Sequence, residues 1–185
     1  MAEHRSMQRA ALLDAARTLL SEGGTDALTF PALAERTGLA RSSVYEYFRS
    51  RAAVVEELCE VDFPAWTAEV EAAMAAADGA QAKVEAYVRR QLALVGDRRH
   101  RAVVAISASE LDAGAREKIR AAHGALVTMI GEALADLGHT QPRLTAMLLQ
   151  GVVDAAVRRI ELGAAEDPAE ITDAAVAMAL RGVGG

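Results

Sequence analysis

Apolar residues recur at the spacing of an α-helix along nearly the whole chain, and no segment of four or more residues alternates like a β-strand. Glycines, aspartates and prolines interrupt this pattern at intervals. The pattern predicts helices over about 6–21, 29–36, 41–47, 51–77, 80–95, 101–107, 113–137, 143–162 and 169–180. We therefore expect an all-α protein, with a small N-terminal unit of three helices followed by a larger bundle of about six.

Local signals mark where several of these helices begin and break. Thr29 stands where an N-cap belongs, with Pro31 tolerated in the first helical turn, and Ser50 caps the helix that starts at Arg51. Pro64 lies inside that long helix and is expected to kink or restart it, because proline has no backbone N–H.

The two short helices are joined by a tight turn at Gly38, which is the arrangement of a helix-turn-helix. Four of the seven aromatic residues, Phe30, Tyr45, Tyr47 and Phe48, fall in this region. Both phenylalanines are needed for a small core. The core set comprises Leu12, Ala16, Leu19, Phe30, Leu33, Leu39, Val44 and Phe48. Tyr45 and Tyr47, on the second short helix, are not needed for this core.

The net charge of the whole chain is negative, whereas the segment that contains the second short helix is basic. The 20 basic and 26 acidic residues give a net charge of −6, which excludes a basic protein that coats nucleic acid. Between Arg36 and Arg51, however, four arginines accompany one glutamate. A short basic helix with hydroxyl groups and tyrosines is typical of proteins that bind DNA phosphates and read the major groove.

The segment from Leu28 to Arg51, LTFPALAERTGLARSSVYEYFRSR, resembles the DNA-binding domain of the TetR family of transcriptional regulators. The similar features are a Thr before the first short helix, a Gly-apolar-small turn, and Tyr-x-x-Phe at the end of the second helix. The resemblance implies a DNA-binding domain over residues 1–50 and a helical ligand-binding and dimerisation domain over 51–185. The residues that it implies for DNA binding are Thr29, Arg41, Ser42, Ser43, Tyr45, Glu46, Tyr47 and Arg51.

Several of these positions carry a specific expectation. Thr29 is expected to cap its helix and to contact a phosphate, and Tyr45 and Tyr47 are expected to lie partly on phosphates. Arg51 replaces the lysine usual in the family, so we expect it to keep a phosphate contact with a changed geometry. Glu46 either accepts a hydrogen bond from cytosine N4 or faces away from the phosphates.

The resemblance implies two roles for the C-terminal bundle, which are dimerisation and ligand binding. The expected dimer interface comprises Leu144, Leu148, Gly151, Val152, Ala155, Ile171, Ala175 and Met178. The alternative is that these small and branched residues pack within one monomer. The candidate ligand-binding residues are Phe63, Trp66, Met74, Tyr87, Gln91, Ser107, His123, Met129 and Met147. Aromatic residues and methionines line adaptable apolar sites, and the few polar groups orient a ligand.

Other chemistry finds little support in the sequence. The single cysteine, Cys59, excludes an intrachain disulfide and is expected to be a buried apolar residue, with a thiol sensor as the alternative. The four histidines lack metal-ligand spacing, and phosphate-loop, dinucleotide and nucleophile-elbow motifs do not occur. We expect no metal, no cofactor and no enzymatic activity. With no apolar run of ~18 residues and no signal sequence, a cytoplasmic protein is expected.

These observations predict a homodimeric transcriptional repressor that a small, largely apolar ligand releases from a palindromic DNA operator. One alternative is a DNA-binding dimer that responds to its abundance or to a protein partner. The other is a helical enzyme or binding protein that retains a degenerate helix-turn-helix.

Overall fold

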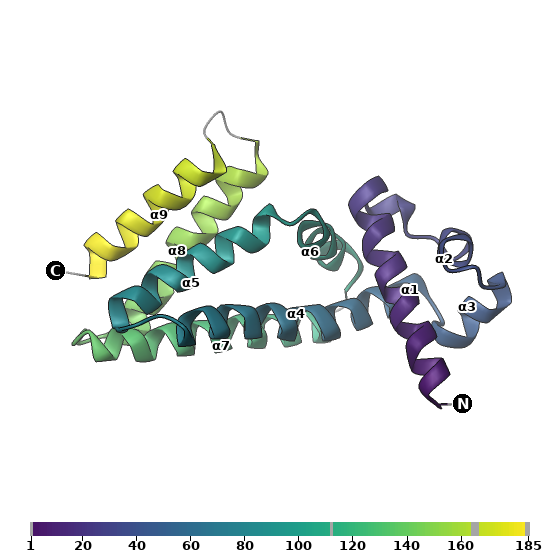
Figure 1. The fold of residues 1–185 in the computed structure, drawn as a ribbon, viewed down its shortest axis with the longest axis horizontal. Helices are drawn as coiled ribbons and strands as arrows, with labels where there is room; N and C mark the ends of the chain where they lie inside the picture. The colour runs from purple at the N-terminus through teal and green to yellow at the C-terminus, as the bar shows by residue number, and fades with distance from the viewer. Residues whose placement is uncertain (1, 112, 164–166, 184–185) are drawn as a thin grey trace. The chain divides into compact units, whose positions relative to one another are not determined.

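The computed structural model describes residues 2–111, 113–163 and 167–183, and within these ranges the structure consists of helices without any strand (Figure 1). This confirms the expected all-α fold. The elements are α1 (Ala2–Gly23), the 3₁₀ helix η1 (Thr25–Ala27), α2 (Phe30–Thr37), α3 (Arg41–Tyr47), α4 (Arg51–Ala75), α5 (Ala80–Gly96), α6 (Arg98–Glu110), α7 (Ala113–Asp136), α8 (Pro142–Glu161) and α9 (Pro168–Val183).

The helices form two compact units. The first unit comprises Met1–Asp62 and Arg98–Ile119, and the second comprises Phe63–Asp97 and Arg120–Gly185. The first unit therefore contains the start of α4 and all of α6, in addition to the three helices expected there. Arg9 and Arg17 of α1 explain the inclusion of α4, because they pair with Glu57 and Asp62.

Most helical bounds follow the sequence pattern, but α1 begins at Ala2 instead of near Ser6, and α6 spans Arg98–Glu110 instead of 101–107. Two features differ further. The helix η1 was not predicted, since three residues are too few for a periodic signal. The expectation that Pro64 restarts its helix is wrong, because α4 runs without a break from Arg51 to Ala75 with Pro64 inside. As expected, the Ser50 hydroxyl accepts a hydrogen bond from the Ala53 N–H at 3.1 Å.

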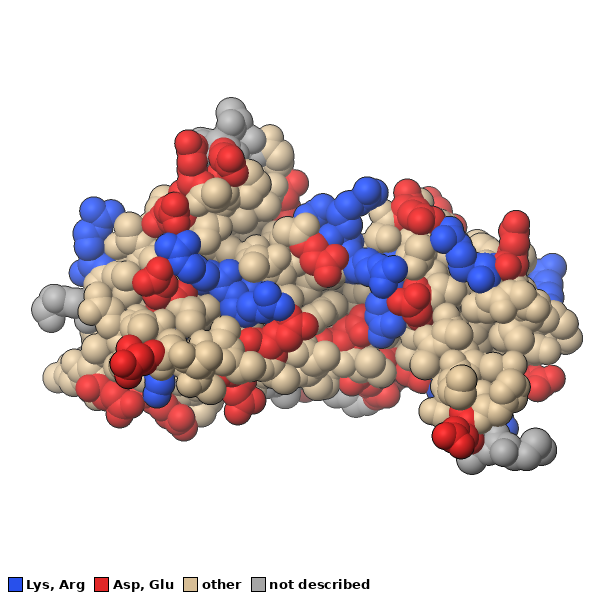
Figure 2. Space-filling view, viewed as in Figure 1, with Lys and Arg blue, Asp and Glu red and all other residues tan. Residues whose placement is uncertain are grey.

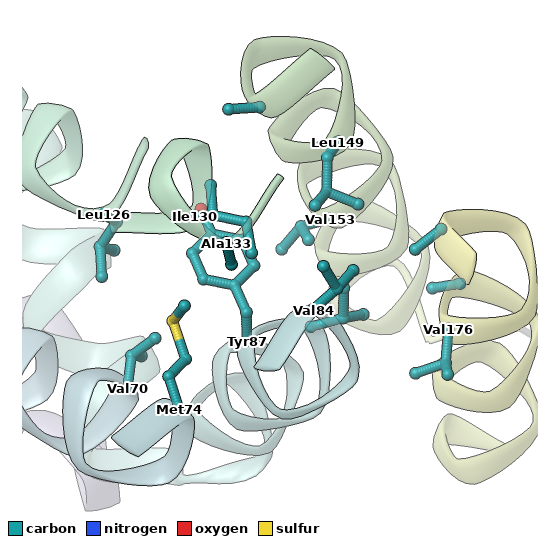
Figure 3. Packing of buried hydrophobic residues seen from close by; sticks show 14 of the residues in the cluster. Val70, Met74, Val84, Tyr87, Leu126, Ile130, Ala133, Leu149, Val153 and Val176 are labelled. Carbon is teal, nitrogen blue, oxygen red and sulfur yellow. The ribbon is translucent and has the colours of Figure 1, made fainter. Parts of the chain in front are cut away.

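The core of the second unit brings α4, α5, α7, α8 and α9 together around Tyr87 (Figure 3). Tyr87 is fully buried and lies among Val70, Met74, Ile130 and Ala133. Within this unit α5 packs against both α8 and α9. None of the described helices has the length and apolar character that a membrane-crossing segment requires.

Candidate nucleic-acid interface

The turn between α2 and α3 is built by local capping. The Thr29 hydroxyl accepts a hydrogen bond from the Ala32 N–H at 3.3 Å, which caps the N-terminus of α2 as expected. Gly38 ends α2 in the left-handed conformation with φ of 69°, where a side chain would be strained. Buried Val44 and Phe48 then hold α3 on the rest of the unit.

The helix α3 has two faces of different character. Arg41, Ser42, Tyr45 and Glu46 are exposed, at the i, i+1, i+4, i+5 spacing that places them on one side of a helix. Ser43 and Tyr47 are half-buried. The structure thus separates the predicted DNA-binding residues of α3 into an open face of four residues and a supporting pair.

Tyr45 is exposed to solvent and also packs against Phe30. Its side chain is 52% exposed, while its ring centroid lies 4.6 Å from that of Phe30 at an interplanar angle of 56°. Phe30 is buried at the start of α2. The contact restricts the Tyr45 ring and joins the two helices of the motif.

Tyr47 connects α3 to α1. Its hydroxyl donates a hydrogen bond to the Gln8 side-chain carbonyl. The guanidinium of Arg5 lies over the Tyr47 ring, 5.7 Å from the ring centroid, and Arg5 Nη2 also donates to the Glu46 carbonyl at 3.4 Å. Sequence reasoning missed Arg5 and Gln8, since their proximity to α3 depends on how α1 packs.

Arg51 is directed into the first unit. Its Nη2 donates to the Thr25 carbonyl of η1 at 2.6 Å and lies 3.6 Å from the Glu110 carboxylate of α6. Its Nε atom is buried and makes no hydrogen bond. These contacts differ from the phosphate contact expected at this position.

Ion pairs neutralise many arginines of the first unit. Arg9 pairs with Glu57, Arg17 with Asp62, Arg36 with Glu22 and Arg99 with Asp14. The hydrogen bonds to these carboxylates raise the pKa of Arg9, Arg17 and Arg36 above its usual value. Figure 2 accordingly shows basic and acidic side chains interspersed on the visible face of the first unit.

Three arginines around α3 differ from this group. Arg5, Arg41 and Arg49 are exposed and make no ion pair with any other described residue. Within residues 1–60, which contain 9 acidic and 7 basic side chains, the arginines without an acidic partner in the described part of the chain are therefore these three, on or beside α3. A local surplus of this kind can attract a polyanion to an acidic protein.

Among the described residues, no group of three His, Cys, Asp or Glu side chains is arranged to hold a metal ion.

The ligand-binding candidates fall in different places. Met74, Tyr87 and Gln91 are buried in the core of the second unit, and Met129 packs against it. Phe63 and Trp66 contact each other edge to face, with centroids 5.1 Å apart.

Three other candidates are not part of that group. Ser107 belongs to the first unit, where its hydroxyl donates to the Val104 carbonyl at 2.7 Å. Met147 is 59% exposed on α8, so it does not line the interior of the second unit. The side chain of His123 lies outside the described part of the structure.

A polar network sits beside the core around Tyr87. The Tyr87 hydroxyl donates to Gln150 Oε1, and Gln150 Nε2 donates to Gln91 Oε1 at 3.2 Å and to Asp154 at 2.9 Å. Burial raises the pKa of Tyr87 to about 12 and keeps it a donor. Sequence reasoning missed Gln150, although its position in the apolar run Met147–Val153 was a visible signal.

The predicted dimer residues form an apolar surface on α8 and α9. Leu148, Gly151, Val152, Ala155, Ile171, Ala175 and Met178 line a shallow groove of about 380 Å³, together with Ala156 and Ala174. Leu148 is 65% exposed and Met178 62% exposed, and Leu144 is exposed as well. Packing within one chain accounts for buried Ala175 and for Val152 and Ile171, which contact the core of the second unit, but it leaves Leu144, Leu148 and Met178 exposed.

The N-terminal part of the chain matches a known protein family. Residues 12–58, which include the helix-turn-helix, match the family described as "Bacterial regulatory proteins, tetR family". No curated protein shows significant sequence similarity to the chain.

Solved structures extend the likeness in fold to almost the full length. A TetR-like transcriptional regulator from Rhodococcus sp. RHA1 is 18% identical with a TM-score of 0.75, covering 96% of each chain. FadR from Bacillus subtilis, solved with stearoyl-CoA, is 17% identical with a TM-score of 0.75, covering 94% of this chain and 98% of that one.

A third similar structure was solved with DNA. AibR, in complex with isovaleryl coenzyme A and operator DNA, is 16% identical with a TM-score of 0.72, covering 92% of this chain and 97% of that one. At these identities the likeness shows that this chain shares their fold.

Proposed function

We propose that this protein is a homodimeric transcriptional repressor of the tetR family, which a small and largely apolar ligand releases from a palindromic DNA operator. The observation that carries the proposal is the open face of α3. Arg41, Ser42, Tyr45 and Glu46 are exposed together on a short helix anchored by buried Val44. These side chains supply the cation, hydroxyl and carboxylate groups that contact phosphates and base edges.

Thr29 beside this face completes the surface that we assign to DNA, while Ser43 and Tyr47 support it from the buried side. The contacts of Arg51 with Thr25 and Glu110 support a structural role for that residue. Two such surfaces in a dimer would enter successive major grooves, which is why we expect a palindromic site.

The apolar ligand is supported by the second unit and by two neighbours of the same fold. The core around Tyr87 contains the apolar side chains Val70, Met74 and Ile130, with Gln91 as a buried polar group. FadR and AibR were solved with acyl-coenzyme A molecules, whose acyl chains are apolar. A ligand shifts DNA affinity only by its differential affinity for the two conformations, typically ~1–3 kcal/mol.

The experiment is a salt series of binding to a duplex from upstream of the protein's own gene, with an unrelated duplex of equal length. We expect strong, salt-sensitive preference for the upstream duplex, because base contacts add to phosphate contacts. Arg41→Ala should reduce that preference, whereas Lys83→Gln, which removes a charge from α5, should leave it unchanged. Absence of binding to either duplex at low salt would contradict the proposal.

A further inference from the structure

Arg5 in the first turn of α1 is held beside α3 without an acidic partner among the described residues. Its guanidinium lies over the Tyr47 ring at 5.7 Å, and one N–H group donates to the Glu46 carbonyl at 3.4 Å. Both partners belong to the C-terminal turn of α3. The side chain is exposed, so these two contacts restrict it at the surface.

The hydrogen-bonding capacity of Arg5 is largely unused. A guanidinium carries five N–H donors in a planar fork, and the structure gives one of them a partner. Arg9, four residues later on the same helix, makes two hydrogen bonds to the Glu57 carboxylate instead. Arg9 is thus neutralised by a carboxylate that accepts two of its hydrogen bonds, while Arg5 has no described acidic partner and keeps most of its donors.

Arg49 adds a second exposed cation just after the C-terminal end of α3. It lies two residues beyond the end of α3 and makes no ion pair with a described residue. The C-terminal end of α3 therefore has two arginines without an acidic partner in the part of the chain that the structure describes. Arg49 follows it in the chain, and Arg5 reaches it from α1. A ring beneath a guanidinium keeps its fork oriented and its edge open, which suits two parallel hydrogen bonds to a phosphate.

We propose that Arg5, supported by Tyr47, is a phosphate-binding residue for duplex DNA, and that it extends the DNA-binding surface from α3 to the first turn of α1. This inference rests on the proposed function. Tyr47 acts in it as a positioning residue through its ring. Gln8, which accepts from the Tyr47 hydroxyl, holds that ring in place.

The test compares the unaltered full-length protein with Arg5→Gln in salt series on a mixed-sequence duplex and on the upstream duplex. One lost phosphate contact should make the slope of log K against log[salt] less negative by about 0.9. It should weaken binding to both duplexes alike, by about 5- to 10-fold near 0.1 M salt. Lys83→Gln, with the same change in charge, should leave slope and affinity unchanged.

A double-mutant cycle tests the support by Tyr47. Arg5→Gln should cost less than about twofold in affinity when Tyr47→Leu has already removed the ring, since coupled residues are non-additive. Equal losses of affinity with and without the Tyr47 ring would overturn the proposal that Tyr47 positions Arg5. Because Arg5 is exposed, its variant should keep the melting temperature of the unaltered protein, which separates lost contact from lost fold.

The outcomes distinguish this inference from the function on which it rests. If the unaltered protein binds DNA with a salt-dependent affinity and Arg5→Gln retains its full slope, the Arg5 site is overturned and the proposed function stands. If the unaltered protein binds no DNA at low salt, both are overturned.

Discussion

The guanidinium of Arg51 joins three elements of the first unit. From the start of α4 it donates to the Thr25 carbonyl of η1 at 2.6 Å and lies 3.6 Å from Glu110 of α6. Hydrogen bonds from charged groups contribute about 1.5–3 kcal/mol, and partial exposure of the side chain reduces this value. The contacts predict a contribution of Arg51 to folding stability.

Arg51→Ala should therefore lower the free energy of unfolding by about 1–2 kcal/mol, because the Thr25 carbonyl loses its charged donor. The salt slope of DNA binding should stay unchanged, since the number of phosphate contacts is the same. Urea unfolding and a salt series measure the two quantities. A less negative slope with unchanged stability would show instead that Arg51 contacts a phosphate.

Tyr87 predicts a dependence of stability on alkaline pH. Burial raises its pKa from the usual 10 to about 12 in the folded protein, so folding favours the protonated phenol. The stability from this difference is complete below pH ~10 and is lost as the pH rises through ~12, by about 2–3 kcal/mol in total. Burial raises the pKa of Cys59 to about 12 as well. Its contribution to stability is therefore also lost as the pH rises, beginning near pH ~9.

Denaturant unfolding between about pH 9 and 11 measures this effect, with Cys59→Ala as the background that removes the thiol contribution. In that background the free energy of unfolding should decline above pH ~10, and adding Tyr87→Phe should flatten the decline. The phenylalanine variant should be less stable at neutral pH by about 1 kcal/mol, because the hydrogen bond to Gln150 is lost. An unchanged alkaline decline in the phenylalanine variant would contradict the assignment to Tyr87.

At the scale of elements, α4 continues through a proline that could have ended it. Pro64 cannot donate to the carbonyl four residues earlier, and the unit boundary between Asp62 and Phe63 lies next to it. Contacts hold the helix on both sides of this weak point. Before Pro64, Asp62 accepts three hydrogen bonds of 2.6 to 3.1 Å from Arg17. After it, Val70 and Met74 are buried in the core of the second unit.

Pro64→Ala should raise the free energy of unfolding by about 1–3 kcal/mol, because alanine restores the N–H and removes the clash of the ring. Pro142→Ala is the matched control, since Pro142 lies in the first turn of α8, where proline costs little. Its stability should change by less than about 0.5 kcal/mol. Equal effects of the two substitutions, measured by urea unfolding, would contradict a specific cost at Pro64.

At the scale of the whole molecule, the apolar stripe on α8 and α9 calls for a partner surface. Leu144, Leu148 and Met178 are exposed along a groove floored by small residues such as Gly151 and Ala155. Small residues allow close approach of helices, and contiguous exposed apolar surface marks an interaction site. A second copy of the chain, with its own α8 and α9, would cover the stripe in a four-helix interface.

Leu148→Glu should convert the proposed dimer into a monomer, because it would place a carboxylate in the centre of the apolar contact. Val61→Glu is the control, as Val61 is an exposed apolar residue of α4 that belongs to the first unit. Sedimentation velocity should give half the mass for the first variant and an unchanged mass for the second. A dimeric Leu148→Glu protein would place the interface elsewhere.

The local chemistry of the chain determined the helices and the helix-turn-helix. Thr29 caps α2, Gly38 ends it in a conformation that glycine favours, and Ser50 caps α4, all through bonds between near neighbours. The apolar period is likewise local, so it also indicated the stripe on α8 that carries Leu144 and Leu148. These features could be predicted because each depends on residues within a few positions of one another.

Tertiary packing decided which charged side chains form ion pairs and which remain without an acidic partner. Arg9 and Glu57 are 48 residues apart, and Arg51 reaches Glu110 from a different helix, so their pairing has no local signal. The same packing placed Ser107 in the first unit and Arg5 against Tyr47. Helical periodicity states which face of a helix is apolar, but not which helix lies opposite. For that reason the sequence indicated a DNA-binding helix, and only the fold showed which arginines beside it remain unneutralised.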